Sequence, residues 1–284
     1  MTIIILMIYN SSCVGMCSYK SQNYGNKGDY MSFSALKSCS EKIENYLRYQ
    51  PGYPKKILNY LYEEVGLSRE SVIADIGSGT GVLARLLLER GSRVVAIESD
   101  DQMREIAERL LSDEFQRFVS LNATAENTTL FNDSVNFIFC THSFKQCCTD
   151  KCRKEFLRII KPSGAFVFLY NRLNKEEGFL EDFQKLLDQY SIHAENDGCT
   201  EILEDEIADF FGLTAYSHVS VPNRQSIDYE GAKAKLLSEI SIPQCENVYF
   251  EMLDEFHNIF ERYNQNRKVS LNYTTEAYIG GLGK

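Results

Sequence analysis

The sequence predicts an α/β protein built on a mostly parallel sheet, and two stretches of the chain carry that prediction. Residues 72–81 read V-I-A-D-I-G-S-G-T-G, a short apolar run that ends in closely spaced glycines. Residues 93–98 read R-V-V-A-I-E, a second short apolar run. Such runs are typical of strands buried on both faces, and their alternation with helical segments indicates parallel strands joined by right-handed crossovers.

The glycine-rich turn after the first strand predicts a ligand site. Gly77, Gly79 and Gly81 allow the backbone to bend sharply and to lie close to a bound molecule. Residues 82–90 follow with helical spacing, so a helix begins where the turn ends. A strand, a glycine turn and a helix N-terminus together indicate a nucleotide-type site at the carboxyl edge of the sheet.

Two acidic residues near this turn narrow the choice of nucleotide. Glu98 ends the second apolar run, where a carboxylate can accept hydrogen bonds from ribose hydroxyls. Asp75 lies at the mouth of the turn, where its charge would repel a pyrophosphate at short range. A cationic ligand such as S-adenosylmethionine, with its ammonium and sulfonium groups, suits this position better. The alternative is a nicotinamide dinucleotide, which would make the chain an NAD(P)-dependent oxidoreductase.

The remaining elements of the first part of the chain alternate in the same way. Apolar runs predict further strands over residues 118–121, 135–140 and 165–170. Helical spacing predicts helices over residues 53–65 and 101–111, before the first strand and after the second.

Beyond residue 175 the pattern changes to helices with charged faces, up to residue 211. Two more strands are expected, over residues 214–221 and 270–278. The helices expected between them, over residues 229–240 and 247–263, could close over the open edge of the sheet.

These motifs resemble those of the class I S-adenosylmethionine-dependent methyltransferases, and most closely the type 11 branch related to quinone-biosynthesis methyltransferases. The D-x-G-x-G-x-G run at residues 75–81 and the acid Glu98 match that family. Residues 134–139 resemble its fourth strand, and residues 161–164, K-P-S-G, resemble its K-P-G-G turn. Residues 49–54, Y-Q-P-G-Y-P, resemble the Y-R-P-x-Y-P signature of one subgroup.

The resemblance implies a Rossmann-like fold, with a seven-stranded, mostly parallel sheet, helices on both faces and a helical cap insertion. Residues 10–40 are rich in Ser, Asn, Gly and Tyr with little periodicity, which predicts a flexible lead-in over residues 1–40, followed by a methyltransferase domain over residues 41–284. Within that domain the core would span about 53–172, and the helical cap and last strands would span 173–284.

The resemblance also implies a set of cofactor-binding residues. They are Tyr53, Asp75, Gly77, Ser78, Gly79, Gly81, Glu98, Ser99, Met103, Ala125, Glu126 and Thr141. Ala125 and Glu126 would contact adenine, and Met103 would stack on it. His142, directly after the fourth strand, is the candidate base for the methyl acceptor. Such an enzyme would transfer the methyl group in line to a small-molecule acceptor.

Three substitutions depart from the pattern of the family. Gln50 stands in place of an arginine, Asn136 in place of an acid and Ser163 in place of a glycine. They leave open a second alternative, a non-catalytic protein that binds S-adenosylmethionine without transferring its methyl group.

Composition limits the partners of the chain. The formal net charge of -10 over 284 residues argues against a broad nucleic-acid surface. Residues 3–8 are apolar but too short to span a bilayer, and no basic residue precedes them as in a signal peptide. Cys147, Cys148 and Cys152 lack the paired C-x-x-C spacing of zinc sites. We therefore expect a cytoplasmic monomer or homodimer without metal, nucleic acid or membrane partners.

Overall fold

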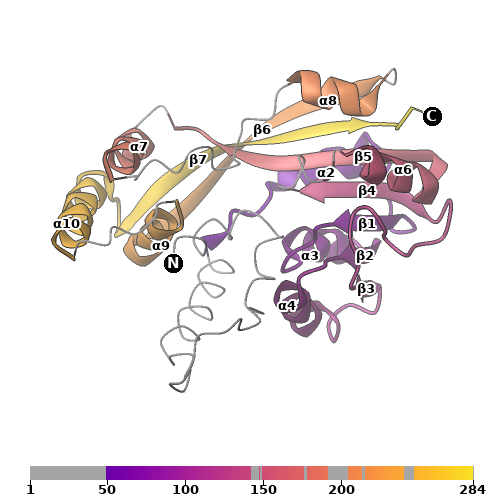
Figure 1. Cartoon of the computed structure of the whole chain (residues 1–284), viewed down its shortest axis with the longest axis horizontal. Coiled ribbons are helices and arrows are strands. Elements are labelled where there is room, and N and C mark those ends of the chain that lie inside the picture. Colours follow the sequence, from indigo (N-terminus) through magenta and orange to yellow (C-terminus); the bar gives the residue numbers. More distant parts are fainter. Residues whose placement is uncertain are drawn as a thin grey trace, which may run out of the picture.

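A computed structural model describes residues 49–141, 147, 149–175, 178–190, 204–212, 215–239 and 246–283. These residues form one seven-stranded sheet with helices packed on it (Figure 1). The strands are β1 (Val72–Ile76), β2 (Arg93–Ile97), β3 (Phe118–Leu121), β4 (Val135–Thr141), β5 (Ile160–Leu173), β6 (Tyr216–Asp228) and β7 (Lys268–Gly280). The helices are α2 (Lys55–Glu63), α3 (Val82–Glu89), α4 (Asp101–Leu111), α6 (Asp150–Ile159), α7 (Phe179–Tyr190), α8 (Glu204–Phe211), α9 (Tyr229–Glu239) and α10 (Glu246–Tyr263).

The order of the strands defines where a ligand site is expected. The sheet runs β3-β2-β1-β4-β5-β7-β6, with neighbouring strands parallel from β3 to β5. β7 is antiparallel to β5, and β6 is antiparallel to β7. The predicted seven-stranded, mostly parallel sheet is therefore confirmed. The strand order reverses between β1 and β4, and ligands in such folds bind beyond the carboxyl ends of the strands at this point.

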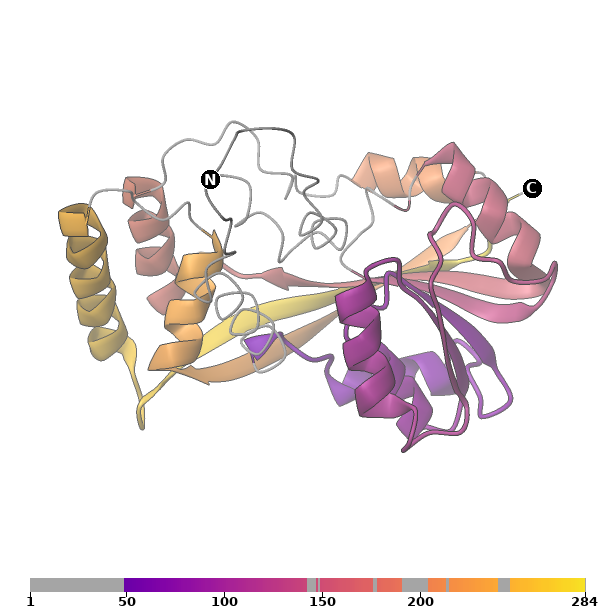
Figure 2. The same ribbon diagram turned by 60° about the horizontal axis from the view of Figure 1, so that its bottom comes forward.

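Apolar side chains cover both faces of the parallel part of the sheet. On one face Leu61 of α2 and Leu87 of α3 pack with Phe139 of β4 in one cluster. On the other face Phe156 of α6 and Phe211 of α8 pack in a second cluster. Figure 2 shows α6 and α8 on the opposite side of the sheet from α2 and α3. The parallel strands are thus buried on both faces, as their short apolar runs predict.

The second part of the chain forms a lobe on extended strands. β5, β7 and β6 are longer than β1 to β4, and the pairing of β6 with β7 continues to Asp228 and Lys268. Beyond the carboxyl ends of β1 and β4, helices α7, α9 and α10 surround a third apolar cluster that includes Phe183, Leu236 and Phe256 (Figure 1). We call this part, α7, α9, α10 and the ends of β5, β6 and β7 that carry them, the second lobe. The expected domain boundaries stay a prediction.

The segment before α2 is tied to the strands of the second lobe. Asn223 donates a hydrogen bond from Nδ2 to the carbonyl oxygen of Gly52 at 2.8 Å, and Gln225 donates from Nε2 to that of Tyr49 at 2.8 Å. The hydroxyl of Tyr49 donates to Asp228 at 3.2 Å. The Y-Q-P-G-Y-P segment therefore connects the second lobe with α2, which begins after Pro54 rather than at residue 53.

Two of the three departures from the family pattern have a structural account. Asn136 Oδ1 accepts hydrogen bonds from the N–H of Val72 at 3.0 Å and from Lys161 Nζ at 3.1 Å, so it joins β4 to its neighbours as an acid could. Ser163 is exposed. The next residue, Gly164, has no room for a side chain, because a Cβ would lie 2.7 Å from the carbonyl oxygen of Asn136.

Candidate functional site

The glycine turn has the backbone geometry that its sequence predicts. Gly77, Gly79 and Gly81 all have positive φ, at 63°, 55° and 82°. The N–H groups of Gly77 and Ser78 donate to the carbonyl oxygen of Ile97 at 2.9 Å and 3.2 Å, so the turn is fixed to the end of β2. Left-handed backbone is costly for residues with a Cβ, which explains why glycine recurs here.

Gly81 also has a packing role that the sequence does not reveal. It caps the N-terminus of α3, and a Cβ at this position would lie 2.6 Å from Cδ1 of Leu111 and 3.5 Å from Cβ of Ala107. Both of these residues belong to α4. The third glycine of the motif therefore permits close packing of α3 against α4, whatever it contributes to ligand binding.

Asp75 is the most unusual group of the site. Its side chain is fully buried, and neither carboxylate oxygen accepts a hydrogen bond from any described residue. Burial, with a smaller contribution from the charge of Glu98, raises the pKa of Asp75 to about 7. Buried carboxylates without partners are costly, so this group fits a site whose ligand supplies donors or a positive charge.

Two hydroxyl groups of the turn share this property. Ser78 Oγ and Thr80 Oγ1 are buried and have no hydrogen-bond partner among the described residues. Sequence reasoning missed Thr80, although its position between two glycines of the motif was a signal. Together with Asp75, these hydroxyls suit the amino acid part of S-adenosylmethionine, which offers an ammonium and a carboxylate.

Glu98 fixes the glycine turn from the end of β2. Its side chain is 1% exposed. Its Oε2 accepts a hydrogen bond from the N–H of Gly79 at 2.9 Å, and its Oε1 accepts one from the N–H of Asp100 at 2.8 Å. Burial raises the pKa of Glu98, which the two backbone N–H groups partly offset. Because each carboxylate oxygen has two lone pairs, a ribose contact is compatible with these bonds, and it stays a prediction.

The residues after Glu98 lead into α4. Ser99 is exposed, and Asp100 caps the helix by accepting a hydrogen bond from the N–H of Met103 at 2.9 Å. Met103 is 7% exposed at this helix N-terminus. The cap thus places Met103 in the first turn of α4, shortly after Glu98. Its stacking on adenine stays a prediction.

Ala125 and Glu126 form the tip of a tight turn after β3. The backbone of Thr124 and Asn127 closes this turn with two hydrogen bonds, of 3.4 Å and 3.2 Å. Glu126 is exposed and Ala125 is half-buried. Thr141, at the carboxyl end of β4, is buried. The turn follows β3 and Thr141 ends β4, so both lie at carboxyl ends of parallel strands, on the edge where the glycine turn also lies.

The structure says less about the remaining candidate residues, Tyr53, His142 and the cysteines. Tyr53 is 9% exposed and packs in the same apolar cluster as Ile57 and Leu83. His142 and Cys148 lie outside the described residues. Among the residues that are described, no three His, Cys, Asp or Glu side chains are grouped to hold a metal ion. In the same part of the chain, no helix combines the length and apolar character needed to cross a membrane.

Comparison with known proteins agrees with this geometry. A family described as a methyltransferase domain matches residues 74–168. A methyltransferase-like protein of Schizosaccharomyces pombe, termed uncharacterized, is 22% identical over 249 residues, which cover 86% of this chain and 94% of that protein. A second protein of S. pombe, an uncharacterized methyltransferase, is 21% identical over 244 residues, covering 83% and 93%.

Solved structures show the same fold. A putative type II methyltransferase from Anaeromyxobacter dehalogenans superposes with a TM-score of 0.56 at 16% identity, covering 82% of this chain and 97% of that one. A putative methyltransferase of an antibiotic biosynthesis pathway in Anabaena variabilis gives a TM-score of 0.54 at 21% identity, covering 82% and 100%.

The fold and the glycine turn define a Rossmann-like protein with a nucleotide-type site. With the match of residues 74–168 to a methyltransferase domain and the related proteins named as methyltransferases, the chain is an S-adenosylmethionine-dependent methyltransferase. The prediction of a methyltransferase is confirmed, and the oxidoreductase alternative is not supported.

Proposed function

We propose that this enzyme transfers the methyl group of S-adenosylmethionine in line to a small-molecule acceptor, which binds between the parallel sheet and the second lobe. The observation that carries the proposal is the buried carboxylate of Asp75, which has no partner among the described residues and borders a turn of three glycines with positive φ. That combination suits a ligand with an ammonium group held close to the backbone.

Residues at the carboxyl edge of the parallel sheet would each bind a different part of the cofactor. Asp75 would pair with the ammonium, and Glu98 would accept hydrogen bonds from the ribose. Met103, Ala125 and Glu126 would surround the adenine. The bound cofactor supplies a methyl group already activated by the positive charge on sulfur. The contribution of the protein is therefore to align donor and acceptor and to exclude water.

The acceptor would meet the second lobe. α7, α9 and α10 lie beyond the carboxyl ends of the parallel strands, where open α/β sheets bind ligands (Figure 1). The net charge of -10 favours a small acceptor over a nucleic acid. His142 stays the candidate base for an acceptor that must lose a proton. Membership in the Y-R-P-x-Y-P subgroup and a cytoplasmic location also stay predictions.

Two measurements test the proposal. Calorimetry should show binding of S-adenosylmethionine and S-adenosylhomocysteine, and no binding of NADH. A panel of small hydroxyl, amine and carbon acceptors should then give turnover to S-adenosylhomocysteine with at least one of them. Binding without turnover on any acceptor in the panel would favour the non-catalytic alternative.

Replacing Glu98 by alanine is expected to weaken binding of S-adenosylhomocysteine by about 1.5–3 kcal/mol, the range for hydrogen bonds to a charged group. The variant loses both the ribose acceptor and the bond that fixes Gly79. Glu105→Ala, at an exposed position of α4, is the matched control and should bind normally. A loss of acceptor affinity with intact cofactor binding would contradict the assignment of Glu98.

A further inference from the structure

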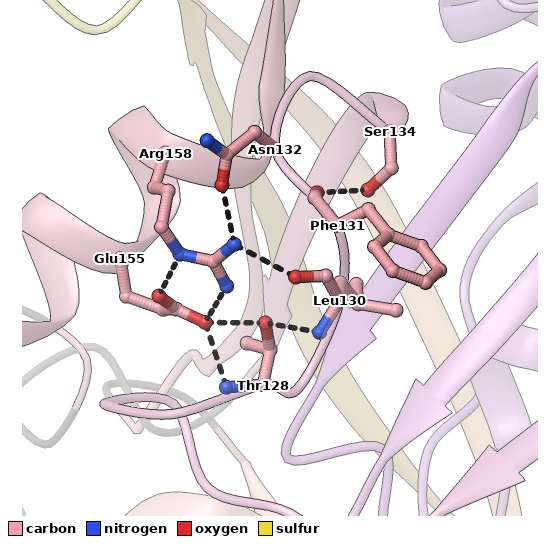
Figure 3. Close-up of polar contacts among 7 residues, drawn as sticks. All are labelled: Thr128, Leu130, Phe131, Asn132, Ser134, Glu155 and Arg158. Atoms are coloured by element: carbon pink, nitrogen blue, oxygen red, sulfur yellow. Dashed lines mark hydrogen bonds and ion pairs between the residues drawn. The ribbon is translucent and has the colours of Figure 1, made fainter.

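Side chains of α6 hold the loop between β3 and β4 in place. Glu155 Oε1 accepts hydrogen bonds from the N–H of Thr128 at 2.8 Å and from its hydroxyl at 2.6 Å. Arg158 donates from Nη1 to the carbonyl oxygen of Leu130 at 2.7 Å and to Oδ1 of Asn132 at 2.8 Å. Figure 3 shows that these contacts converge on one side of the loop. The loop is therefore fixed at three alternate positions, residues 128, 130 and 132.

The two anchoring side chains also fix each other. Arg158 donates from Nε and Nη2 to the two oxygens of Glu155, both at 2.7 Å. These bonds lower the pKa of Glu155 to about 2, so its carboxylate stays ionised near neutral pH. Thr128 is fully buried and Glu155 is 8% exposed. A charged acceptor in such surroundings gives strong and well-aligned hydrogen bonds.

The anchored loop has a backbone that needs support. Thr129 and Asp133 have positive φ, at 62° and 48°. This conformation is rare for residues other than glycine, and for a β-branched residue such as Thr129 it is an outlier. Thr128 and Leu130, the two neighbours of Thr129, are the residues that α6 holds. The hydrogen bonds from α6 thus oppose relaxation of the strained residue.

The anchor lies directly after the turn proposed to contact adenine. Ala125 and Glu126 form the tip of that turn, Asn127 closes it, and Thr128 is the next residue. Glu126 is exposed, and its charge acts on Cys152 near the start of α6. The position of the tip relative to the sheet therefore depends on the bonds between Thr128 and α6.

We propose that Glu155 and Arg158 are positioning residues for purine specificity, which keep the Ala125–Glu126 turn against the amino edge of adenine. The inference rests on the proposed function. A carboxylate accepts a hydrogen bond from the 6-amino group of adenine, but it repels the 6-carbonyl group of hypoxanthine. A fixed turn therefore distinguishes the two purines, whereas a released turn can move away from the unfavourable group.

Calorimetry with S-adenosylhomocysteine and S-inosylhomocysteine tests this inference. The wild type should prefer the adenosyl ligand by about tenfold or more, the value of one hydrogen bond to a charged group. In Glu155→Ala this ratio should fall toward one, mainly because the adenosyl ligand binds less tightly. Thr128→Val removes the two bonds of the hydroxyl, to Glu155 and from the N–H of Leu130, but keeps the bond from the Thr128 N–H. This variant and Arg158→Gln should lower the ratio less.

Asp182→Asn is the matched control. Asp182 joins α7 to α10 by accepting bonds from Arg262 at 2.7 Å and from the hydroxyl of Tyr263 at 2.9 Å, in the second lobe. This variant removes the charge of a comparable anchoring carboxylate, and it should keep the purine ratio of the wild type. An equal loss of both ligands in Glu155→Ala would reveal a purely structural role and overturn the inference.

Other outcomes separate this inference from the proposed function. A wild type that binds both ligands equally would overturn purine positioning alone. A wild type that binds neither would overturn the proposed cofactor site as well. If Glu155→Ala does not fold, Thr128→Val and Arg158→Gln decide the question, and an unchanged ratio in both would overturn the inference.

Discussion

Valine in place of Gly79 is expected to reduce the affinity for S-adenosylhomocysteine by about a hundredfold or more, which corresponds to about 3 kcal/mol. Gly79 has a φ of 55°, where a β-branched residue is strongly disfavoured. Its N–H also donates to Glu98 at 2.9 Å, so a shift of the turn disturbs the ribose site. In addition, the valine side chain would enter the space proposed for the methionine part of the cofactor.

Gly178→Val separates backbone strain from loss of the site. Gly178 has a φ of 64°, and nothing lies within 4 Å of the place where its Cβ would be. This control should lower the melting temperature and leave cofactor binding intact. Calorimetry and thermal unfolding of both variants provide the measurements, and unchanged binding in Gly79→Val would show that the cofactor lies elsewhere.

Asp75→Asn is expected to have opposite effects on stability and on binding. The pKa of Asp75 is raised from 3.8 to about 7 in the folded protein, so between these values the folded state holds a proton that the unfolded state releases. Stability of the ligand-free protein therefore falls as the pH rises through this window, by up to about 4 kcal/mol. Asparagine removes this penalty, and the variant should melt at a higher temperature than the wild type at pH 8.

Cofactor binding should show the complementary pH dependence. Below pH 7 the carboxyl of Asp75 is protonated in the free protein, so an ammonium-bearing ligand must displace that proton. Affinity of the wild type for S-adenosylhomocysteine should therefore fall by up to about tenfold per pH unit below 7. Asp75→Asn should lose most of the affinity at every pH.

Asp113→Asn, at an exposed position, is the control for both measurements of Asp75. It should follow the wild type in thermal unfolding and in calorimetry between pH 5 and pH 8. A wild type whose affinity does not vary with pH would contradict the pairing of Asp75 with the ammonium.

The parallel part of the fold could be predicted because its strands are apolar runs. β2, β3 and β4 lie within one residue of the predicted ranges 93–98, 118–121 and 135–140, since burial on both faces demands continuous apolar sequence. The ends of β5 and β6 could not be predicted in this way. Their residues beyond Tyr170 and Val221 are largely polar, and their strand structure depends on pairing with β7, which is distant in the sequence.

In the site, too, features set by neighbouring residues could be predicted, and contacts between distant residues could not. The spacing of the glycines and the position of Asp75 are local, and they sufficed to predict a cationic ligand. The bond from Gly79 to Glu98 joins the turn after β1 to the residue after β2 and spans 19 positions, and the bond from Thr128 to Glu155 spans 27 positions. Residues at such separations meet only after the sheet has formed, so these contacts could not be predicted from sequence spacing.

The long pairing of β5, β7 and β6 also determines how the molecule can move. The second lobe is carried on three hydrogen-bonded strands, of which β7 pairs with both neighbours. A lobe on a single flexible linker could swing freely, but this one can change its distance from the parallel sheet only by twisting or bending of the strands. Exchange of a small acceptor would thus proceed by limited elastic deformation, and the lobe and the parallel sheet would unfold together in one cooperative transition.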